Sequence, residues 1–205
     1  MSSETDTVGG ARIPKRARGK ERVARLQQAA TVVFAEKGYE AATMTEIAAR
    51  AGAPIGSLYQ FFPDKEALAE TLVQNYFALL AADLQALEAR VNQIDTETLV
   101  EDLLGLLRAH PQERAAVLPF AEARTSGPIH PTTFRHMLRK QIAAILRARA
   151  PTLTAEAARD IAIVMLQLMK ASGALGDEEG LPGRAAALRE IKALAVQYLE
   201  QRLPT

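Results

Sequence analysis

The pattern of apolar residues along the chain is helical almost throughout. Apolar positions recur every three or four residues, and no stretch alternates strictly between apolar and polar residues as a half-buried strand does. Glycine, proline and short polar stretches divide the pattern into segments. We therefore expect an all-α fold. The expected helices cover residues 20–37, a short stretch after Thr43, residues 54–62, a segment of about 28 residues that carries Leu68 to Val91, residues 96–109, a segment that starts at Pro111, residues 131–150, a segment after Thr154, and a last segment that includes 188–199.

Several segment ends carry residues that start or stop helices. Gly38 follows the last apolar position of the first segment, where a left-handed residue would end a helix. Thr43 lies three residues before Glu46, which is the spacing of a capping box. Asp64 is placed to cap the long fourth helix. Pro119 should kink or interrupt the helix that Pro111 opens, because proline removes a backbone hydrogen bond.

The composition excludes several classes of protein. The absence of cysteine excludes a disulfide framework, a thiolate metal site and a cysteine nucleophile, and it fits a cytoplasmic protein. The polar N-terminus lacks the apolar stretch of a secretory signal, and no run of about 18 apolar residues predicts a membrane span. Glycine-rich phosphate loops and helical metal-ligand spacings are also missing, so we expect no enzyme activity, no catalytic residues, no metal and no cofactor.

Positive charge gathers near the N-terminus. Residues 1–65 carry ten lysines and arginines against seven acidic residues, whereas residues 66–205 carry fifteen against seventeen. Residues 1–19 lack periodicity, and we interpret them as a flexible basic arm. Such a cluster is typical of a surface that binds a polyanion, although a solvated tail has the same composition. Its basic residues, which continue into the first helix, are Arg12, Lys15, Arg16, Arg18, Lys20, Arg22 and Arg25.

Residues 20–62 predict three short helices, the last two joined by a tight turn, which is the arrangement of a helix-turn-helix. If Leu58 points inward, Phe62 shares its face at 100° per residue, and Gly56 and Gln60 point away. The outer face then offers hydrogen-bonding groups and no charge. Gln60 and Ser57 are suited to base edges, and the Tyr59 hydroxyl is suited to a phosphate oxygen.

The segment TMTEIAARAGAPIGSLYQFFPDKEAL, with FAEKGYEAAT upstream, closely resembles the helix-turn-helix of the tetracycline-repressor (TetR) family of bacterial transcription regulators. The resemblance covers about residues 20–70. It implies a DNA-binding domain over 20–66 and a helical effector-binding and dimerisation domain over 67–205. It also implies a homodimer that binds a roughly palindromic double-stranded operator. Family members are usually repressors that a small-molecule effector releases from DNA.

The resemblance also assigns residues to DNA by position. Two positions depart from the commoner family pattern, because Ile55 stands where lysine is frequent and Phe61 where histidine is frequent. Ile55 could instead meet a thymine methyl group. The positions that resemble phosphate contacts are Thr43, Tyr59 and Lys65, and those that resemble base or groove contacts are Thr45, Ile55, Gly56 and Ser57.

Beyond residue 70 the resemblance contributes only architecture. The last two helices carry apolar stripes that could pack across a two-fold axis, or could close the monomer's own core. An effector would bind among the middle helices, since bundle cores hold ligands, although methionine and phenylalanine at helical spacing are more often plain core. The candidate pocket residues are Phe120, Arg124, Phe134, Met137, Gln141 and Met165.

One alternative keeps the fold and changes the function. A helical ligand-binding or interaction protein that has lost operator binding would show the same apolar pattern. The feature that separates the two is the outer face of residues 54–62 together with the basic arm, and both are present in this chain.

Overall fold

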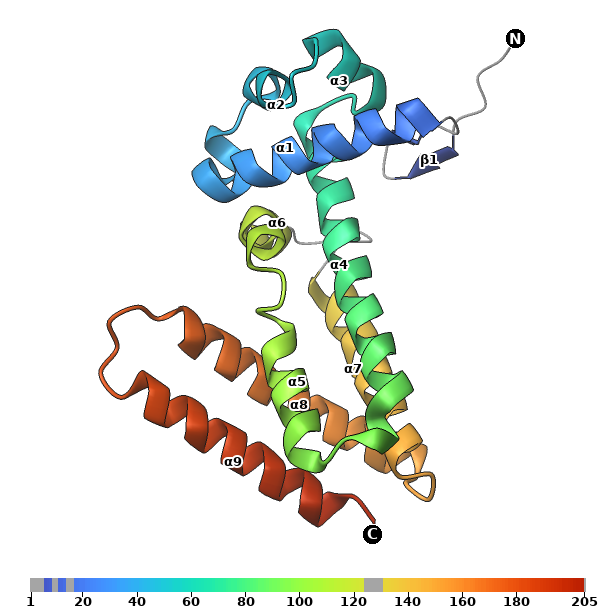
Figure 1. The fold of residues 1–205 in the computed structure, drawn as a ribbon, viewed down its shortest axis with the longest axis vertical. Coiled ribbons are helices and arrows are strands. Elements are labelled where there is room, and N and C mark those ends of the chain that lie inside the picture. Colours follow the sequence, from blue (N-terminus) through green and yellow to red (C-terminus); the bar gives the residue numbers. More distant parts are fainter. Residues whose placement is uncertain (1–5, 9–10, 14–16, 124–130, 205) are drawn as a thin grey trace. The chain divides into compact units, whose positions relative to one another are not determined.

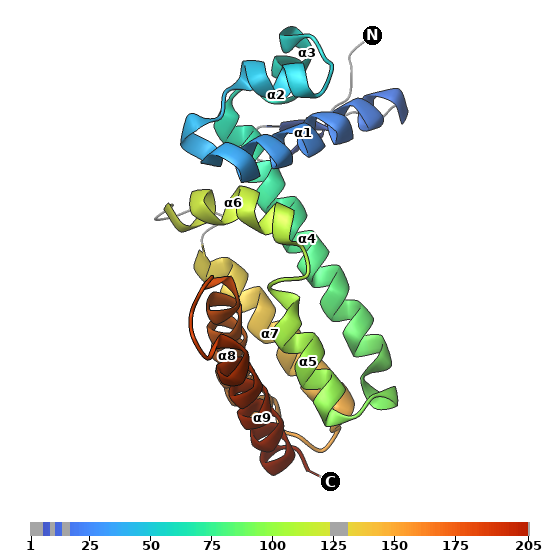
Figure 2. The same cartoon turned by 60° about the vertical axis from the view of Figure 1, so that its left-hand side comes forward.

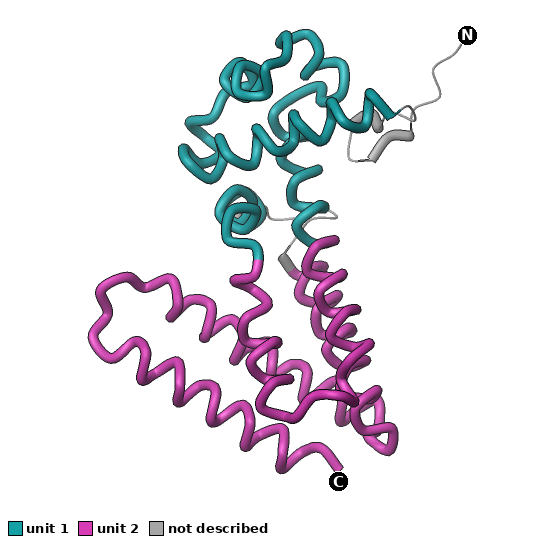
Figure 3. Tube along the Cα trace, in the orientation of Figure 1, with its two compact units in different colours: residues 1–77, 110–131 teal, residues 78–109, 132–205 magenta. Residues whose placement is uncertain are grey.

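The computed structural model describes residues 6–8, 11–13, 17–123 and 131–204. It divides the chain into two compact units (Figure 3). Unit 1 comprises residues 1–77 and 110–131, and unit 2 comprises residues 78–109 and 132–205. The first unit therefore includes a segment that the sequence analysis assigned to the effector-binding and dimerisation domain.

Helices account for most of the described residues, which confirms the all-α fold (Figures 1 and 2). None of the described helices is both long enough and apolar enough to cross a membrane. The elements are β1 (Asp6–Val8), β2 (Ala11–Ile13), α1 (Ala17–Ala41), α2 (Met44–Arg50), α3 (Ile55–Phe61), α4 (Lys65–Arg90), the 3₁₀ turn η1 (Val91–Gln93), α5 (Thr96–Leu106), α6 (Pro111–Ala123), α7 (Pro131–Arg149), α8 (Ala155–Asp177) and α9 (Arg184–Arg202).

The structure differs from the expectation near the N-terminus. We expected residues 1–19 to lack regular structure, but β1 and β2 pair as a short antiparallel hairpin, and α1 begins at Ala17. Sequence periodicity could not predict strands of three residues, because alternation needs a longer run to be recognised.

Unit 1 is built around α1, which packs against α2 and α6. Gly38 interrupts the helical backbone of α1 with φ 77°, as its position at the end of the apolar pattern indicated. Pro119 lies inside α6 and does not end the helix, so the interruption that the sequence suggested does not occur. Packing along α1 favours the helix despite the hydrogen bond that proline removes. The core of the unit includes Leu26, Ala30, Val33, Phe34, Ile47, Leu58, Phe62, Leu68 and Val73, all almost fully buried.

Unit 2 is a helical assembly in which α5, α8 and α9 pack against one another. Thr154 caps α8 as predicted, since the Ala157 N–H donates to its hydroxyl oxygen at 3.1 Å. Aliphatic and methionine side chains fill the core, as helical amphipathicity indicated. Its most buried residues include Leu99, Val100, Leu103, Leu138, Ile142, Ile145, Ile161, Met165, Met169, Ala195 and Leu199.

Polar contacts connect the helices of unit 2. Arg149, at the end of α7, donates to the carbonyl oxygens of Val91 (2.7 Å) and Ile94 (2.5 Å), which lie where η1 begins and just after it ends. Lys192 of α9 forms ion pairs with Glu97 and Glu101 of α5. The Arg149 contacts connect the end of α7 to the turn between α4 and α5.

Candidate nucleic-acid interface

Helices α2 and α3 pack against each other and are joined by a tight turn. Helix α2 ends at Arg50, and α3 begins at Ile55. Gly52, between them, has φ 61°, a conformation that residues with a Cβ rarely adopt. The Ala53 N–H donates to the carbonyl of Ala48 at 3.0 Å, which fixes the turn against the end of α2. The local geometry is that of a helix-turn-helix.

Helix α3 has one buried face and one exposed face. Leu58 is 0% exposed, and Phe62, which ends the helix, is 1% exposed, which confirms both as inward anchors. Tyr59 is 51% exposed and Ile55 is 39% exposed, so α3 presents large apolar groups to its surroundings. The exposed residues of α3 are Ile55, Gly56, Tyr59 and Gln60, with Ser57 and Phe61 half-buried at the borders.

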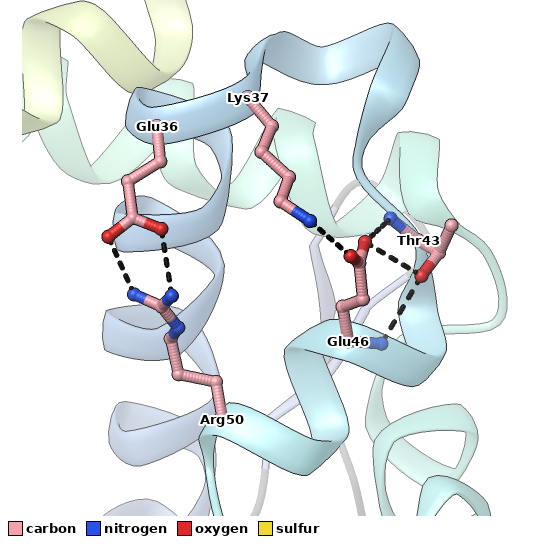
Figure 4. Close-up of polar contacts among 5 residues, drawn as sticks. All are labelled: Glu36, Lys37, Thr43, Glu46 and Arg50. Carbon is pink, nitrogen blue, oxygen red and sulfur yellow. Dashed lines mark hydrogen bonds and ion pairs between the residues drawn. The ribbon is translucent and has the colours of Figure 1, made fainter.

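The N-terminus of α2 carries the predicted capping box (Figure 4). The Glu46 N–H donates to the Thr43 hydroxyl at 3.2 Å, and the Thr43 N–H donates to the Glu46 carboxylate at 3.2 Å. The Thr43 hydroxyl also donates to this carboxylate at 3.0 Å, and Lys37 of α1 forms an ion pair with it. The hydrogen bond from Lys37, followed by those from Thr43, lowers the pKa of the Glu46 carboxyl. A phosphate at Thr43 would compete with Glu46 for the hydroxyl proton.

The other end of α2 is also held against α1 (Figure 4). The Arg50 guanidinium donates two hydrogen bonds of 2.8 Å to the Glu36 carboxylate. This two-point contact fixes the orientation of both groups, because the planar guanidinium matches the carboxylate. Thr45, the other candidate on α2, is exposed and lies between the two contacts. The helix that precedes α3 is thus fixed to α1 near both of its ends.

Sequence reasoning did not select Arg22 as a site residue. In the structure its Nη1 lies 3.5 Å from the Ser57 Oγ, so a basic side chain of α1 lies beside the first turn of α3. The neighbouring residues Arg18, Lys20 and Arg25 are exposed on the same part of α1. The basic cluster pointed to this region, but only the fold could show that Arg22 reaches α3.

Lys65, predicted as a phosphate contact, is half-buried at the first position of α4. Its ammonium donates to the carbonyl oxygens of Tyr39 (2.7 Å), Ala42 (3.1 Å) and Glu40 (3.2 Å). The same nitrogen lies 4.4 Å from the centre of the Tyr39 ring. An ammonium has three N–H groups, and three protein carbonyls accept from it here.

The candidate effector residues are divided between the two units. Phe120 of α6 is buried in unit 1, with its ring 4.7 Å from that of Tyr39. Arg124 lies outside the described residues. In unit 2, Met165 is fully buried, whereas Phe134, Met137 and Gln141 on α7 are half-buried.

Gln141 differs from the other candidates in having an unsatisfied polar atom. Its Oε1 is buried and accepts no hydrogen bond from the residues that the structure describes. An amide oxygen in this state is available to a donor group of a bound molecule or to a water molecule. Over the described ranges, histidine and acidic side chains form no group that could hold a metal ion.

Comparisons with known proteins agree with this architecture. Residues 26–72 match the family described as bacterial regulatory proteins, tetR family, and residues 93–199 match the family described as tetracyclin repressor-like, C-terminal domain. Among curated protein sequences, none matches the chain.

Several solved structures share the fold. A transcriptional regulator from Rhodococcus sp. Rha1 is 20% identical with a TM-score of 0.69, and the match covers 89% of this chain and 98% of that one. A member of the TetR family from Streptomyces coelicolor A3 is 20% identical with a TM-score of 0.61, covering 90% and 99%. The multidrug binding protein EbrR, complexed with imidazole, is 21% identical with a TM-score of 0.57, covering 90% and 96%.

The first family match contains α2, the turn and α3, with the anchors Leu58 and Phe62 and the exposed face between them. The second begins in η1 and extends into α9, and it alone covers more than half of the chain. With both of its parts matched in their expected order, the chain belongs to the tetR family of bacterial regulatory proteins.

Proposed function

We propose that this regulator is a repressor that binds a roughly palindromic operator as a homodimer and leaves it when a small-molecule effector binds. The observation that carries the proposal is the exposed face of α3, where Tyr59 and Ile55 remain open to solvent while Leu58 and Phe62 fix the helix from behind. A helix held in this way can enter the major groove without losing its own packing.

The chemistry of the exposed face suits groups of the major groove. The Gln60 amide can bond to an adenine edge in two places, and the Ile55 side chain can contact a thymine methyl group. Gly56 has no heavy atom near the position of an added Cβ, so the backbone of α3 can approach the bases closely. We assign Ser57 and Thr45 to the groove, and Tyr59 and Thr43 to the DNA backbone.

We propose that the homodimer forms through α8 and α9. These helices pack together in unit 2 and leave large apolar side chains exposed on their outer faces. Leu194 of α9 is 57% exposed, and Ile163 and Val164 of α8 are 39% and 38% exposed. A two-fold axis would bring two such faces together as a four-helix interface. Leu194→Glu should convert the dimer to monomer in sedimentation, whereas Glu200→Gln, a change at an exposed polar position of α9, should leave it dimeric.

The effector is proposed to bind near α7 and α8 in unit 2. Phe134, Met137 and Met165 offer apolar contacts, and the unsatisfied Gln141 oxygen offers a hydrogen-bond acceptor. The multidrug binding protein that this fold resembles is complexed with imidazole, which supports a small organic molecule as the ligand class. Effector binding would shift the population away from the DNA-competent state by its differential affinity for the two states.

Selection from a pool of random-sequence duplexes tests the proposal. The full chain should enrich inverted half-sites with centres about one helical turn apart, since each protomer presents one α3. The double variant Tyr59→Ala with Gln60→Ala should enrich nothing, because both substitutions lie on the exposed face. Enrichment of no sequence by the unmodified chain would favour a helical ligand-binding protein without an operator.

A further inference from the structure

Lys65 occupies a position that is unfavourable within its own helix. It is the first residue of α4, where the helix dipole disfavours a positive charge. Its ammonium reaches away from this end to carbonyls that follow the break at Gly38, those of Tyr39 and Glu40 at the end of α1 and that of Ala42 just before α2. Carbonyls at the end of a helix lack partners within it and favour a cation, so the unfavourable location is compensated there.

The Tyr39 ring completes the site around this ammonium. The nitrogen lies over the ring at 4.4 Å, within the range of a cation–π contact. Phe34 of α1 meets the ring edge-on at 5.7 Å, and Phe120 of α6 lies at 4.7 Å. Both phenylalanines are buried, so the ring is held by neighbours that cannot easily move. Lys65 thus contacts a fixed surface rather than a flexible loop.

The contacts of Lys65 bear on the position of α2. Ala42, whose carbonyl accepts from Lys65, immediately precedes Thr43, the N-cap of α2. The path of the backbone at Ala42 sets where α2 begins, and the turn at its end sets where α3 begins. The Lys65 ammonium therefore lies at the point from which the whole helix-turn-helix is positioned.

We propose that Lys65 and Tyr39 form a positioning lock for the helix-turn-helix, and that Lys65 acts through the α1–α2 connection rather than by binding a DNA phosphate. All three of its N–H groups are used by carbonyls, and a phosphate would have to displace at least one of them. The lock forms within the protein and does not require DNA. Only its effect on affinity depends on the proposed function.

Amide hydrogen exchange of the DNA-free full chain tests the lock directly. The probes are the amides of Thr43, Glu46 and Ile47, which bond within the first turn of α2. Lys65→Met should make them exchange about tenfold faster, an effect of the size of one lost helix cap. Lys65→Arg should restore slow exchange, because a guanidinium keeps the charge, the donors and the stacking on Tyr39. Lys140→Met, at an exposed lysine of α7, should change nothing at these probes.

A second variant covers the case in which Lys65→Met does not fold. Tyr39→Leu leaves every charge in place and removes the ring beneath the ammonium, and it should accelerate the same amides. Unchanged exchange at Thr43, Glu46 and Ile47 in either folded variant would overturn the lock, whether or not the chain binds DNA.

Affinity for a random-sequence duplex separates the two roles of Lys65. Removing a phosphate-binding side chain lowers the slope of log K against log salt by about 0.9 for each phosphate it neutralised. Removing a positioning residue should weaken binding at every salt concentration and leave that slope unchanged, as should Tyr39→Leu. A slope lowered by Lys65→Met with unaltered exchange would make Lys65 a phosphate contact. Absence of DNA binding by the unmodified chain would refute the proposed function and leave the exchange result standing.

Discussion

Truncation of the inward anchor of α3 gives the sharpest prediction about how this helix is held. Leu58 is 0% exposed in the core of unit 1. Leu58→Ala removes three carbon groups, which at about 0.8 kcal/mol each corresponds to about 2.4 kcal/mol of lost burial. The cavity left behind raises the expected loss of unfolding free energy to about 3–4 kcal/mol, because the surrounding helices relax only in part.

Urea unfolding followed by far-UV circular dichroism measures this loss. With a slope of about 2 kcal/mol per molar urea, the midpoint for Leu58→Ala should fall by about 1.5–2 M. Gln60→Ala is the matched control, because this residue is on the same helix, is exposed, and should change stability by less than about 0.5 kcal/mol. A loss below about 1 kcal/mol for Leu58→Ala, or an equal loss for Gln60→Ala, would refute the division of α3 into an anchoring and an exposed face.

Three further predictions concern the surroundings of α3. Thr43→Ala should lower the unfolding free energy by about 1 kcal/mol in urea titrations, because the Glu46 amide loses its cap, and an unchanged midpoint would argue against the capping box. Glu46 has a lowered pKa in the folded state, so its contribution to stability is complete above the ordinary pKa of 4.5 and is lost as the pH falls through the lower folded value. The stability gap between the unmodified chain and Glu46→Gln should accordingly close in acid titrations below about pH 4.5, and a gap that widens there would contradict the assignment. Deletion of residues 1–16, which spares α1, should weaken DNA binding and reduce its salt slope by about 0.9 for each phosphate that these residues neutralise, whereas an identical slope would mean that they neutralise none.

Local rules predicted much of the helix-turn-helix. The Thr43–Glu46 spacing predicted a capping box that the structure contains, because both partners lie within one helical turn. Helical periodicity placed Leu58 and Phe62 on one inward face, because residues four apart lie on the same side of a helix, and both are buried. These features depend on neighbours only a few residues away, and the sequence displays such neighbours directly.

Contacts between distant residues could not be predicted in this way. Lys65 is predicted from the sequence as a phosphate contact, and nothing near it in sequence indicates that its ammonium also meets carbonyls more than twenty residues upstream. The packing of α6 on α1 similarly brings Phe120, a candidate pocket residue, to Tyr39, and apolar spacing alone does not show this contact. In both cases the fold supplies a contact that the local sequence does not show.

The short hairpin shows a different limit. Strands β1 and β2 have three residues each, too few to show alternation, and they pair through backbone hydrogen bonds. Such pairing leaves no signature in the hydrophobic pattern. Composition identified the basic cluster that begins at Arg12, but it could not indicate the backbone conformation of β1 and β2.

The central claim is that the exposed face of α3 reads DNA sequence, and the ratio of two affinities tests it most directly. Fluorescence anisotropy at one fixed salt concentration would compare a selected palindromic duplex with a scrambled duplex of equal length. We predict at least about a thousandfold preference for the palindrome, with two chains bound, and a preference reduced by about tenfold or more in Gln60→Ala. Equal affinity for the two duplexes would contradict the claim. A preference that remains intact both in Gln60→Ala and in Tyr59→Ala would also contradict it.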